Sequence, residues 1–246
     1  MKALIMAAGY ATRLYPLTEN QPKPLLPVAG KPIIEYIIEK MEAFSNIDVI
    51  YVVTNNKFYM HFEEWRRSFN YRIPIEIIND GTLTNDDRLG AIGDMHYVIS
   101  KKNIDDDLLV IAGDNLFDFD LAKLRDFSQD KGIVICAYDV GDYSLATQYG
   151  IVSVDTQGKV VSFVEKPAQP PSTLAALGVY LFKKDKVALL RKYVAEGNNT
   201  DAPGYFIQWA YRVDDVYSYV FHGQWYDIGD LKSYESANKL YEQKNK

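Results

Sequence analysis

The sequence predicts an α/β fold: a doubly wound, mostly parallel, Rossmann-like sheet followed by a smaller β-rich lobe. Three observations support this. Apolar runs of strand length alternate with helical patterns over the first 140 residues, which is typical of a parallel sheet. From residue 150 the alternation gives way to a hairpin pattern. Two apolar runs end in small or polar residues, as expected where ligands meet the carboxyl ends of parallel strands.

The individual elements follow from residue type and periodicity. The run DVIYVVT at 48–54 is rich in β-branched residues, which favours a strand buried on both faces, whereas residues 32–44 place isoleucines at helical spacing. In the first part we expect strands at 3–8, 48–54, 73–78, 107–112 and 132–139, and helices at 32–44, 57–69, 89–99 and 120–130. In the second part we expect strands at 150–154, 159–164, 174–182 and 216–221, and helices at 186–195, 203–213 and 231–243. We expect a single domain over 1–246, with a first part at 1–140 and a second part at 141–246 that includes the final helix.

Composition narrows the function classes. A net charge of −6 argues against a broad nucleic-acid interface, which needs a basic surface. A single cysteine, Cys136, allows no intrachain disulfide, and the three histidines lack metal-ligand spacing. No apolar run approaches the length of a membrane span, and the N-terminal run has no cleavage-type segment after it. We therefore expect a cytoplasmic protein that binds neither nucleic acid nor membrane.

The stretch after the first strand could bind a nucleotide phosphate. Ala8 and Gly9 have little or no side chain, so a ligand can approach the backbone closely. Arg13 and Lys23 follow in a proline-rich loop and could neutralise phosphate charge. The alternative is an ordinary strand-to-loop junction with two solvated cations.

Two aspartates are candidate ligands of Mg²⁺. Asp114 directly follows the strand at 107–112, and Asp227 lies in a tight turn before the last helix. Mg²⁺ binds one or two carboxylates and keeps several waters, so two such groups would suffice. Sequence spacing leaves their convergence open. Either aspartate could instead cap a turn or lie in the first turn of a helix.

Two further segments have the chemistry of a substrate site. Glu165 could accept hydrogen bonds from sugar hydroxyls, and Lys166 could pair with a phosphate, unless the two form an exposed ion pair where the strand ends. Residues 79–88 form a long polar loop ahead of Gly90 and Ala91, whose small size could admit a flat base while Asn79 or Asp80 reads its edge. A plain capping loop, with Asp86 or Asp87 as helix cap, is the alternative.

The order of these motifs resembles the sugar-1-phosphate nucleotidyltransferases, most of all the glucose-1-phosphate thymidylyltransferase group. The resemblance runs over nearly the whole chain, through MKALIMAAGYATRLYPLTENQPKPLLPVAGKPIIEY, LVIAGDN, YGIV, FVEKP, ALGVYLF and GQWYDIGDLKSYESAN. It implies a GT-A-like nucleotidyltransferase fold whose first part binds the nucleotide and whose second part binds the sugar. It also implies transfer of a nucleoside monophosphate from a nucleoside triphosphate, dTTP or UTP favoured, to a sugar 1-phosphate, glucose 1-phosphate favoured, with Mg²⁺ as cofactor.

The resemblance also assigns roles to residues. It implies that Arg13, Lys23 and Lys166 are catalytic and that Asp114 and Asp227 ligate Mg²⁺. Ala8, Gly9, Asn79 and Gly90 would contact the nucleoside, and Gly150, Glu165, Lys166 and Gly178 would line the sugar-phosphate pocket.

Two departures from the family pattern concern nucleotide choice. Ala11 replaces the second glycine of the usual G-x-G-T-R, so we expect a less permissive loop there. The segment NDGTLTNDDRLGAIGD replaces the glutamine–proline type of base-reading segment, which leaves the base open. The chain also stops soon after the WYDIGD helix, so we do not expect the tail-dependent oligomer contacts of some relatives.

Three alternative functions stay open. A cytidylyltransferase acting on another phosphate, such as choline phosphate, would use the same charges. A catalytically silent, nucleotide-sugar-binding regulatory subunit would not need all of Arg13, Lys23, Asp114, Lys166 and Asp227. A dinucleotide-dependent Rossmann enzyme fits poorly, because residues 9–13 lack the G-x-G-x-x-G spacing.

Overall fold

The computed structural model describes residues 1–244, which form two compact units. Unit 1 comprises residues 1–2, 89–110 and 122–222, and unit 2 comprises residues 3–88, 111–121 and 223–244. The final helix therefore groups with the N-terminal segment rather than with residues 141–222. That the chain acts as one nucleotidyltransferase domain stays a prediction.

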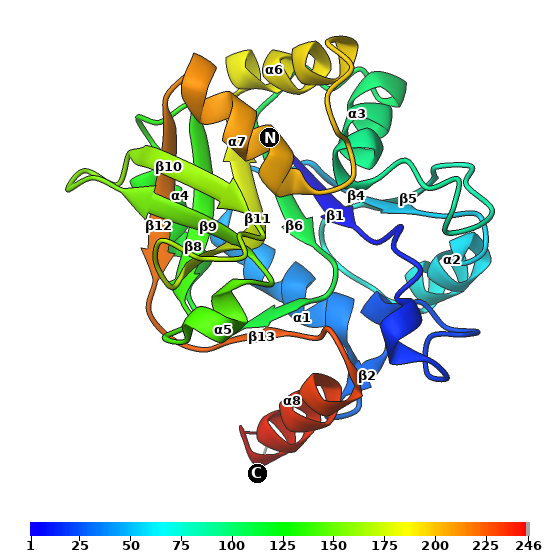
Figure 1. The fold of residues 1–246 in the computed structure, drawn as a ribbon. Coiled ribbons are helices and arrows are strands. Elements are labelled where there is room, and N and C mark those ends of the chain that lie inside the picture. Colours follow the sequence, from blue (N-terminus) through cyan, green and yellow to red (C-terminus); the bar gives the residue numbers. More distant parts are fainter. Residues whose placement is uncertain (245–246) are drawn as a thin grey trace. The chain divides into compact units, whose positions relative to one another are not determined.

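Unit 2 is built on three neighbouring strands in the order β1-β4-β5, with β4 and β5 parallel (Figure 1). Its strands are β1 (Lys2–Met6), β2 (Pro27–Val28), β3 (Lys31–Pro32), β4 (Val49–Thr54), β5 (Ile75–Asn79), β7 (Asn115–Phe117) and β13 (Trp225–Asp227). Its helices are α1 (Ile33–Lys40), α2 (Tyr59–Ser68), α8 (Leu231–Lys244) and the short 3-10 turns η1 (Thr12–Leu14), η2 (Lys23–Leu25) and η3 (Met41–Ala43). Helix α2 packs beside β5, as both ribbon views show.

Burial explains why these segments take these forms. Strand β4 is buried from Ile50 to Thr54 because its β-branched residues face apolar neighbours on both sides. Helix α1 buries Ile33, Ile34, Ile37 and Ile38, the stripe that its periodicity predicts. The core of unit 2 therefore holds the ends of β1, β4 and β5 in fixed positions.

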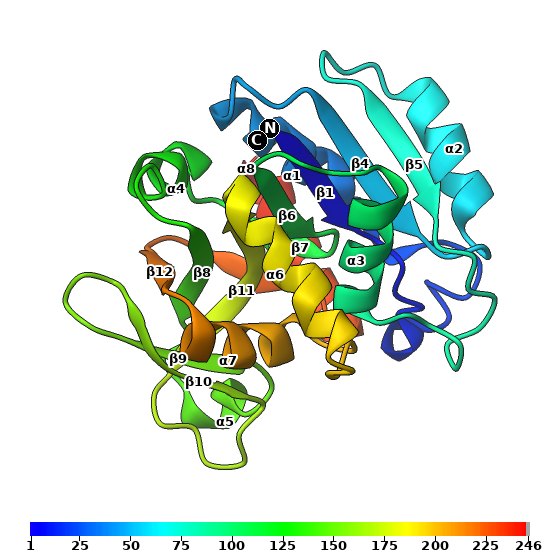
Figure 2. The same ribbon diagram turned by 90° about the horizontal axis from the view of Figure 1, so that it is seen from above.

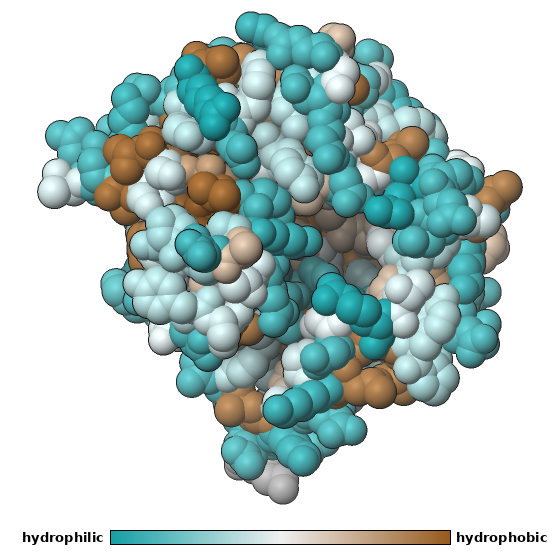
Figure 3. Space-filling view, in the orientation of Figure 1, coloured by the Kyte–Doolittle hydropathy of each residue, from teal (hydrophilic) through white to brown (hydrophobic). Residues whose placement is uncertain are grey.

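Helix α8 attaches to the β2–β3 hairpin of the same unit. The side chain of Asn238 accepts a hydrogen bond from Ala29 N at 2.6 Å, and Tyr234 Oη donates to Pro27 O at 2.6 Å. The rings of Tyr36 and Tyr241 meet edge to face, with centroids 4.9 Å apart. The visible outer side of α8 is mostly hydrophilic (Figure 3).

Unit 1 contains an antiparallel-rich sheet in the order β10-β9-β11-β6, in which β8 pairs with both β11 and β12. Its strands are β6 (Leu108–Ala112, whose last two residues belong to unit 2), β8 (Ile133–Asp139), β9 (Gly150–Val154), β10 (Val160–Glu165), β11 (Leu174–Phe182) and β12 (Val216–Phe221). Its helices are α3 (Ala91–Lys101), α4 (Leu121–Phe127), α5 (Tyr143–Ala146), α6 (Lys184–Ala195) and α7 (Pro203–Val213). Helix α7 packs along β10, and α3 lies beside α6 (Figure 2).

The α/β fold predicted from the sequence is confirmed, and every predicted strand and helix is present within a few residues. Two short pairings escaped prediction: the β2–β3 hairpin and the β7–β13 ribbon. Helix α3 starts at Ala91 with Gly90 as its N-cap residue and has no side-chain cap, so neither Asp86 nor Asp87 caps it. Asp87 instead accepts hydrogen bonds from the backbone of Leu83 and Thr84. Within residues 1–244, no helix combines the length and apolarity that a membrane crossing requires.

Candidate functional site

An ion pair between Lys23 and Asp114 stands at the centre of the candidate site in unit 2. Lys23 begins η2 and is 9% exposed, and its Nζ lies 2.7 Å from Asp114 Oδ2. Asp114 follows β6 after Gly113, whose N donates to Met6 O at 2.8 Å. A Cβ at Gly113 would lie 2.8 Å from that same oxygen, so only glycine lets this segment approach the end of β1. The glycine thus brings Asp114 to the lysine.

The β7–β13 ribbon places Asp227 opposite the residue that follows Asp114. The two strands are antiparallel, and Asp227 lies directly opposite Asn115, the residue after Asp114. Trp225 Nε1 donates to Asn115 Oδ1 at 3.0 Å and ties the strands together. Asp114 directly precedes β7, so the ribbon connects the chain next to Asp114 with the strand that ends at Asp227.

This donor set suits a cation such as Mg²⁺. Residues 1–244 hold no cluster of three or more metal-ligating side chains, so the carboxylates of Asp114 and Asp227 do not belong to a closed protein cage. Mg²⁺ typically takes one or two carboxylates and completes its shell with water and substrate phosphate. That Asp114 and Asp227 hold Mg²⁺ stays a prediction.

Side-chain hydrogen bonds join the loops that follow β1, β4 and β5. Asn55, which is fully buried, donates through Nδ2 to Ala8 O at 2.9 Å and accepts from Phe58 N at 3.0 Å. The hydroxyls of Tyr10 and Thr82 lie 3.4 Å apart, and Thr82 Oγ1 donates to Asp80 Oδ1 at 2.8 Å. The backbone around Ala8 is therefore held in place by side chains from the loops after β4 and β5.

The polar loop after β5 is folded on itself. The amide of Asn79 donates to Asn56 Oδ1 at 2.8 Å and accepts from Gly81 N at 2.8 Å. Thr82 N and Oγ1 both donate to Asp80 Oδ1. Asn79 thus shapes the start of this loop, and reading of a base edge by Asn79 stays a prediction.

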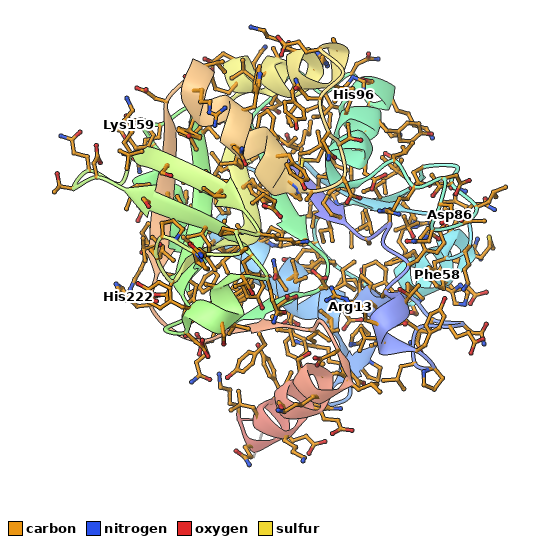
Figure 4. All side chains as sticks on the ribbon, in the orientation of Figure 1. Arg13, Phe58, Asp86, His96, Lys159 and His222 are labelled. Carbon is orange, nitrogen blue, oxygen red and sulfur yellow. The ribbon has the colours of Figure 1, made fainter. Side chains whose placement is uncertain are left out.

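Ala11 takes the left-handed conformation, with φ 48° and ψ 41°. Its carbonyl accepts a hydrogen bond from the fully buried Thr18 at 2.7 Å, so the turn is kept although alanine replaces glycine. Arg13 follows on η1, exposed, and has no ion-pair partner within residues 1–244 (Figure 4). Gly9 is also exposed, and a Cβ there would meet nothing within 4 Å. The loop offers open backbone and a free guanidinium.

Three of the four predicted sugar-phosphate residues, Gly150, Glu165 and Lys166, lie at one end of the β9–β10 pair. Gly150 begins β9 and lies opposite Glu165, the last residue of β10. Burial raises the pKa of the Glu165 carboxyl above its usual range, and the nearby Lys166 ammonium lowers it to a smaller extent. Lys166 is exposed, has φ 44°, and its N donates to Tyr149 O at 3.1 Å.

Two more predicted glycines have visible structural reasons. Gly90, with φ 79°, caps α3, and a Cβ there would lie 2.6 Å from Asp201 Cα. The backbone of residues 200–201 thus occupies the space beside Gly90, which is a packing reason for glycine. Gly178 lies in β11 within the register shift between Ala176 and Tyr180. Their contacts with substrate stay predictions.

The predicted site residues fall into two groups. Unit 2 holds Ala8, Gly9, Arg13, Lys23, Asn79, Asp114 and Asp227, and unit 1 holds Gly90, Gly150, Glu165, Lys166 and Gly178. Sequence reasoning missed Tyr10 and Asn55, which join the loops after the strands, and Asn115, which bonds to Trp225 across the β7–β13 ribbon. Asn55 and Asn115 could have been suspected, because both follow the end of a predicted strand.

Comparison with known proteins identifies the family. The model of the nucleotidyl transferase family matches residues 2–244. The chain belongs to the nucleotidyl transferase family. A protein of Sulfolobus acidocaldarius named "Putative mannose-1-phosphate guanyltransferase" is 34% identical over 97% of this chain and 62% of its own length. A UTP–glucose-1-phosphate uridylyltransferase of Synechocystis is 29% identical over 96% of this chain and 62% of its own length.

The fold is also found among solved structures. One is the crystal structure of a "Putative Glucose-1-Phosphate Thymidylyltransferase" of Bacillus anthracis, which is 23% identical in sequence and superposes with a TM-score of 0.79. The match covers 98% of this chain and 95% of the chain in that structure. This likeness shows the nucleotidyltransferase fold. The chain spans 62% of the length of each of the two curated relatives.

Proposed function

We propose that this chain transfers a nucleoside monophosphate from a nucleoside triphosphate to a sugar 1-phosphate and releases pyrophosphate. The observation that carries the proposal is the Lys23–Asp114 ion pair, with Asp227 on the adjoining ribbon strand. Family membership and the relatives' names support the same reaction class. We also propose that the enzyme acts in the cytoplasm.

The residues can serve a direct in-line transfer. An oxygen of the sugar 1-phosphate forms a bond to the α-phosphorus, and the bond from that phosphorus to the pyrophosphate oxygen breaks. A divalent cation, Mg²⁺ by its ligand preference, would neutralise phosphate charge when bound to Asp114 and Asp227. Arg13 and Lys23 bind and orient the triphosphate, and their charges stabilise the leaving pyrophosphate.

Unit 1 would bind the second substrate. Lys166 would pair with the phosphate of the sugar 1-phosphate, and Glu165 would accept hydrogen bonds from its hydroxyls, with Gly150 and Gly178 lining the pocket. Ala8, Gly9, Asn79 and Gly90 would contact the nucleoside. No nucleophilic side chain is needed, because the acceptor phosphate attacks directly.

The choice of base and sugar is the finer part of the proposal. We favour dTTP or UTP with glucose 1-phosphate, supported by the uridylyltransferase relative. The relative named for guanyl transfer to mannose 1-phosphate makes GTP with mannose 1-phosphate the principal competitor.

The test is pyrophosphate release over a grid of dTTP, UTP, CTP, GTP and ATP against glucose, mannose and N-acetylglucosamine 1-phosphates, with choline phosphate as a further acceptor. Turnover with a sugar 1-phosphate supports the proposal, and turnover with choline phosphate alone replaces it. No turnover with any pair, together with thermal stabilisation by a nucleotide sugar, would identify a silent binding subunit instead.

The variant Asp114→Asn, measured in the same assay, tests whether Asp114 binds the cation. The amide keeps the shape of the side chain but removes the negative charge that a cation needs. Loss of one such group typically costs on the order of 10²–10³ in rate. Unchanged activity in a folded variant would remove Asp114 from the metal site.

A further inference from the structure

A narrow notch in unit 1 holds the carboxylate of Glu165 against two glycines. A Cβ on Gly150 would lie 2.8 Å from Glu165 Oε2. A Cβ on Gly204 would overlap the same oxygen and would lie 2.7 Å from Glu165 Cδ. Gly150 starts β9 and Gly204 lies in the first turn of α7, so the notch is formed by two different elements.

A third residue restricts how the carboxylate can move. Phe163 projects from β10 on the same face as Glu165, two residues earlier, and is only 2% exposed. A Cβ on Gly204 would lie 3.0 Å from its ring, and one on Gly150 would lie 2.5 Å from it. A side chain at Gly204 would therefore meet Glu165 first, and one at Gly150 would meet both the Phe163 ring and the Glu165 carboxylate.

Helical geometry gives no other reason for glycine at position 204. Its φ lies outside the left-handed range, and alanine is the better helix former by about 1 kcal/mol in a helix interior. Contact with Glu165 and Phe163 is therefore what distinguishes glycine from alanine there.

The held carboxylate has an unused capacity to accept hydrogen bonds. Within residues 1–244, Glu165 makes no side-chain hydrogen bond, although it is half-buried. Its oxygens are not among the fully buried unpaired atoms, so a donor on a substrate can reach the carboxylate. The Lys166 ammonium beside it acts at longer range, as a charge rather than as a hydrogen-bond donor.

We propose that Gly204, together with Gly150, is a positioning residue for the acceptor substrate: it leaves the space in which Glu165 presents its carboxylate to substrate hydroxyls. The inference rests on the proposed function for the identity of the acceptor. It assigns to the first turn of α7 a part in substrate selection that acts only through Glu165.

The kinetic test compares Gly204→Ala with wild type, varying each substrate of the best pair from the grid in turn. The KM for the sugar 1-phosphate should rise at least roughly tenfold, about one lost hydrogen bond to a charged group, while the KM for the nucleoside triphosphate changes less than about twofold. Gly132→Ala is the matched control, because a Cβ there would meet only the flexible side chain of Lys186, at 2.6 Å from Cε. Equal rises in both KM values, or no rise, would overturn the inference.

A double-mutant cycle with Glu165→Asp separates positioning from simple damage to the fold. Aspartate withdraws the carboxylate by one bond, about 1.5 Å, which makes room for the new methyl group. Gly204→Ala should lower the melting temperature in the wild-type background and leave it unchanged or higher in the Glu165→Asp background. The acceptor KM should be no worse in the double variant than in the worse single variant.

The outcomes distinguish the two hypotheses. An inactive wild type would refute the proposed function, and the melting-temperature cycle would still decide whether Gly204 accommodates Glu165. An active wild type with additive effects of the two substitutions would refute the positioning role alone. If Gly204→Ala does not fold, the double variant should fold, and its failure to do so would also count against the inference.

Discussion

The hydrogen bond from Trp225 to Asn115 provides a test of the β7–β13 ribbon that requires no substrate. Trp225→Phe keeps an aromatic ring but removes the Nε1 donor, which lies 3.0 Å from Asn115 Oδ1. Asn115 is only 4% exposed, and its Nδ2 is already buried without a hydrogen-bond partner within residues 1–244. The substitution therefore leaves both ends of a buried amide unpaired.

An unsatisfied buried acceptor costs about 1–3 kcal/mol, so we expect a loss of about 2 kcal/mol in the free energy of unfolding. For a chain of this size that corresponds to roughly 4–8 °C in melting temperature, measurable by calorimetry. Trp209→Phe is the matched control: Trp209 is also half-buried, and its indole N–H makes no hydrogen bond within residues 1–244. Equal shifts for the two variants would refute the reasoning, because ring size alone would then explain both.

Three further predictions concern the loops and Glu165. Ala11→Gly should change the melting temperature by less than about 2 °C. Glycine relieves the strain of the left-handed conformation, about 1 kcal/mol, but it also has greater freedom in the unfolded chain, and the two effects offset each other. A large fall in the melting temperature would show that Ala11 is not in that conformation. Tyr10→Phe should raise the KM for the nucleotide several-fold and leave the acceptor KM unchanged, because it removes the hydroxyl that contacts Thr82. Steady-state kinetics measure both values, and an equal rise in the two would contradict the prediction. Since burial raises the pKa of Glu165, stability attributable to its protonated form is present below the usual carboxyl pKa of 4.5 and is lost as pH rises through the higher folded value. Glu165→Gln should remove this slope from unfolding curves measured across that pH range, and an unchanged slope would contradict the shift.

The main fold could be predicted because its strands and helices carry strong local patterns. The run 48–54 and the stripe on α1 are buried as their periodicity implies. Strands β7 and β13 have three residues each, too few for a periodic signal, and they pair only because the chain returns after more than a hundred residues. Residue type alone therefore indicated Asp114 and Asp227, but not that one ribbon brings both together.

The candidate site shows the same division between local and long-range information. Lys23 and Asp114 were selected by chemistry, and their contact depends on the close approach permitted by Gly113. Ala11 was expected to make the loop less permissive, yet it adopts the left-handed geometry that glycine favours, with its carbonyl bonded to Thr18. Gly204 gave no signal at all, because the need for glycine arises from a side chain on another element.

Unit 2 is built from three separate segments of the chain, so its residues are synthesised at different times. This order determines when the two carboxylates proposed to bind the cation are both present. Lys23 emerges from the ribosome first, Asp114 arrives on residues 111–121, and Asp227 follows only after residues 122–222 have been synthesised. Asn238, whose side chain bonds to Ala29 across 209 positions, comes later still. A nascent chain that lacks residues 223–244 has the lysine and one aspartate but not the second carboxylate, so the pair proposed to hold the cation requires that third segment.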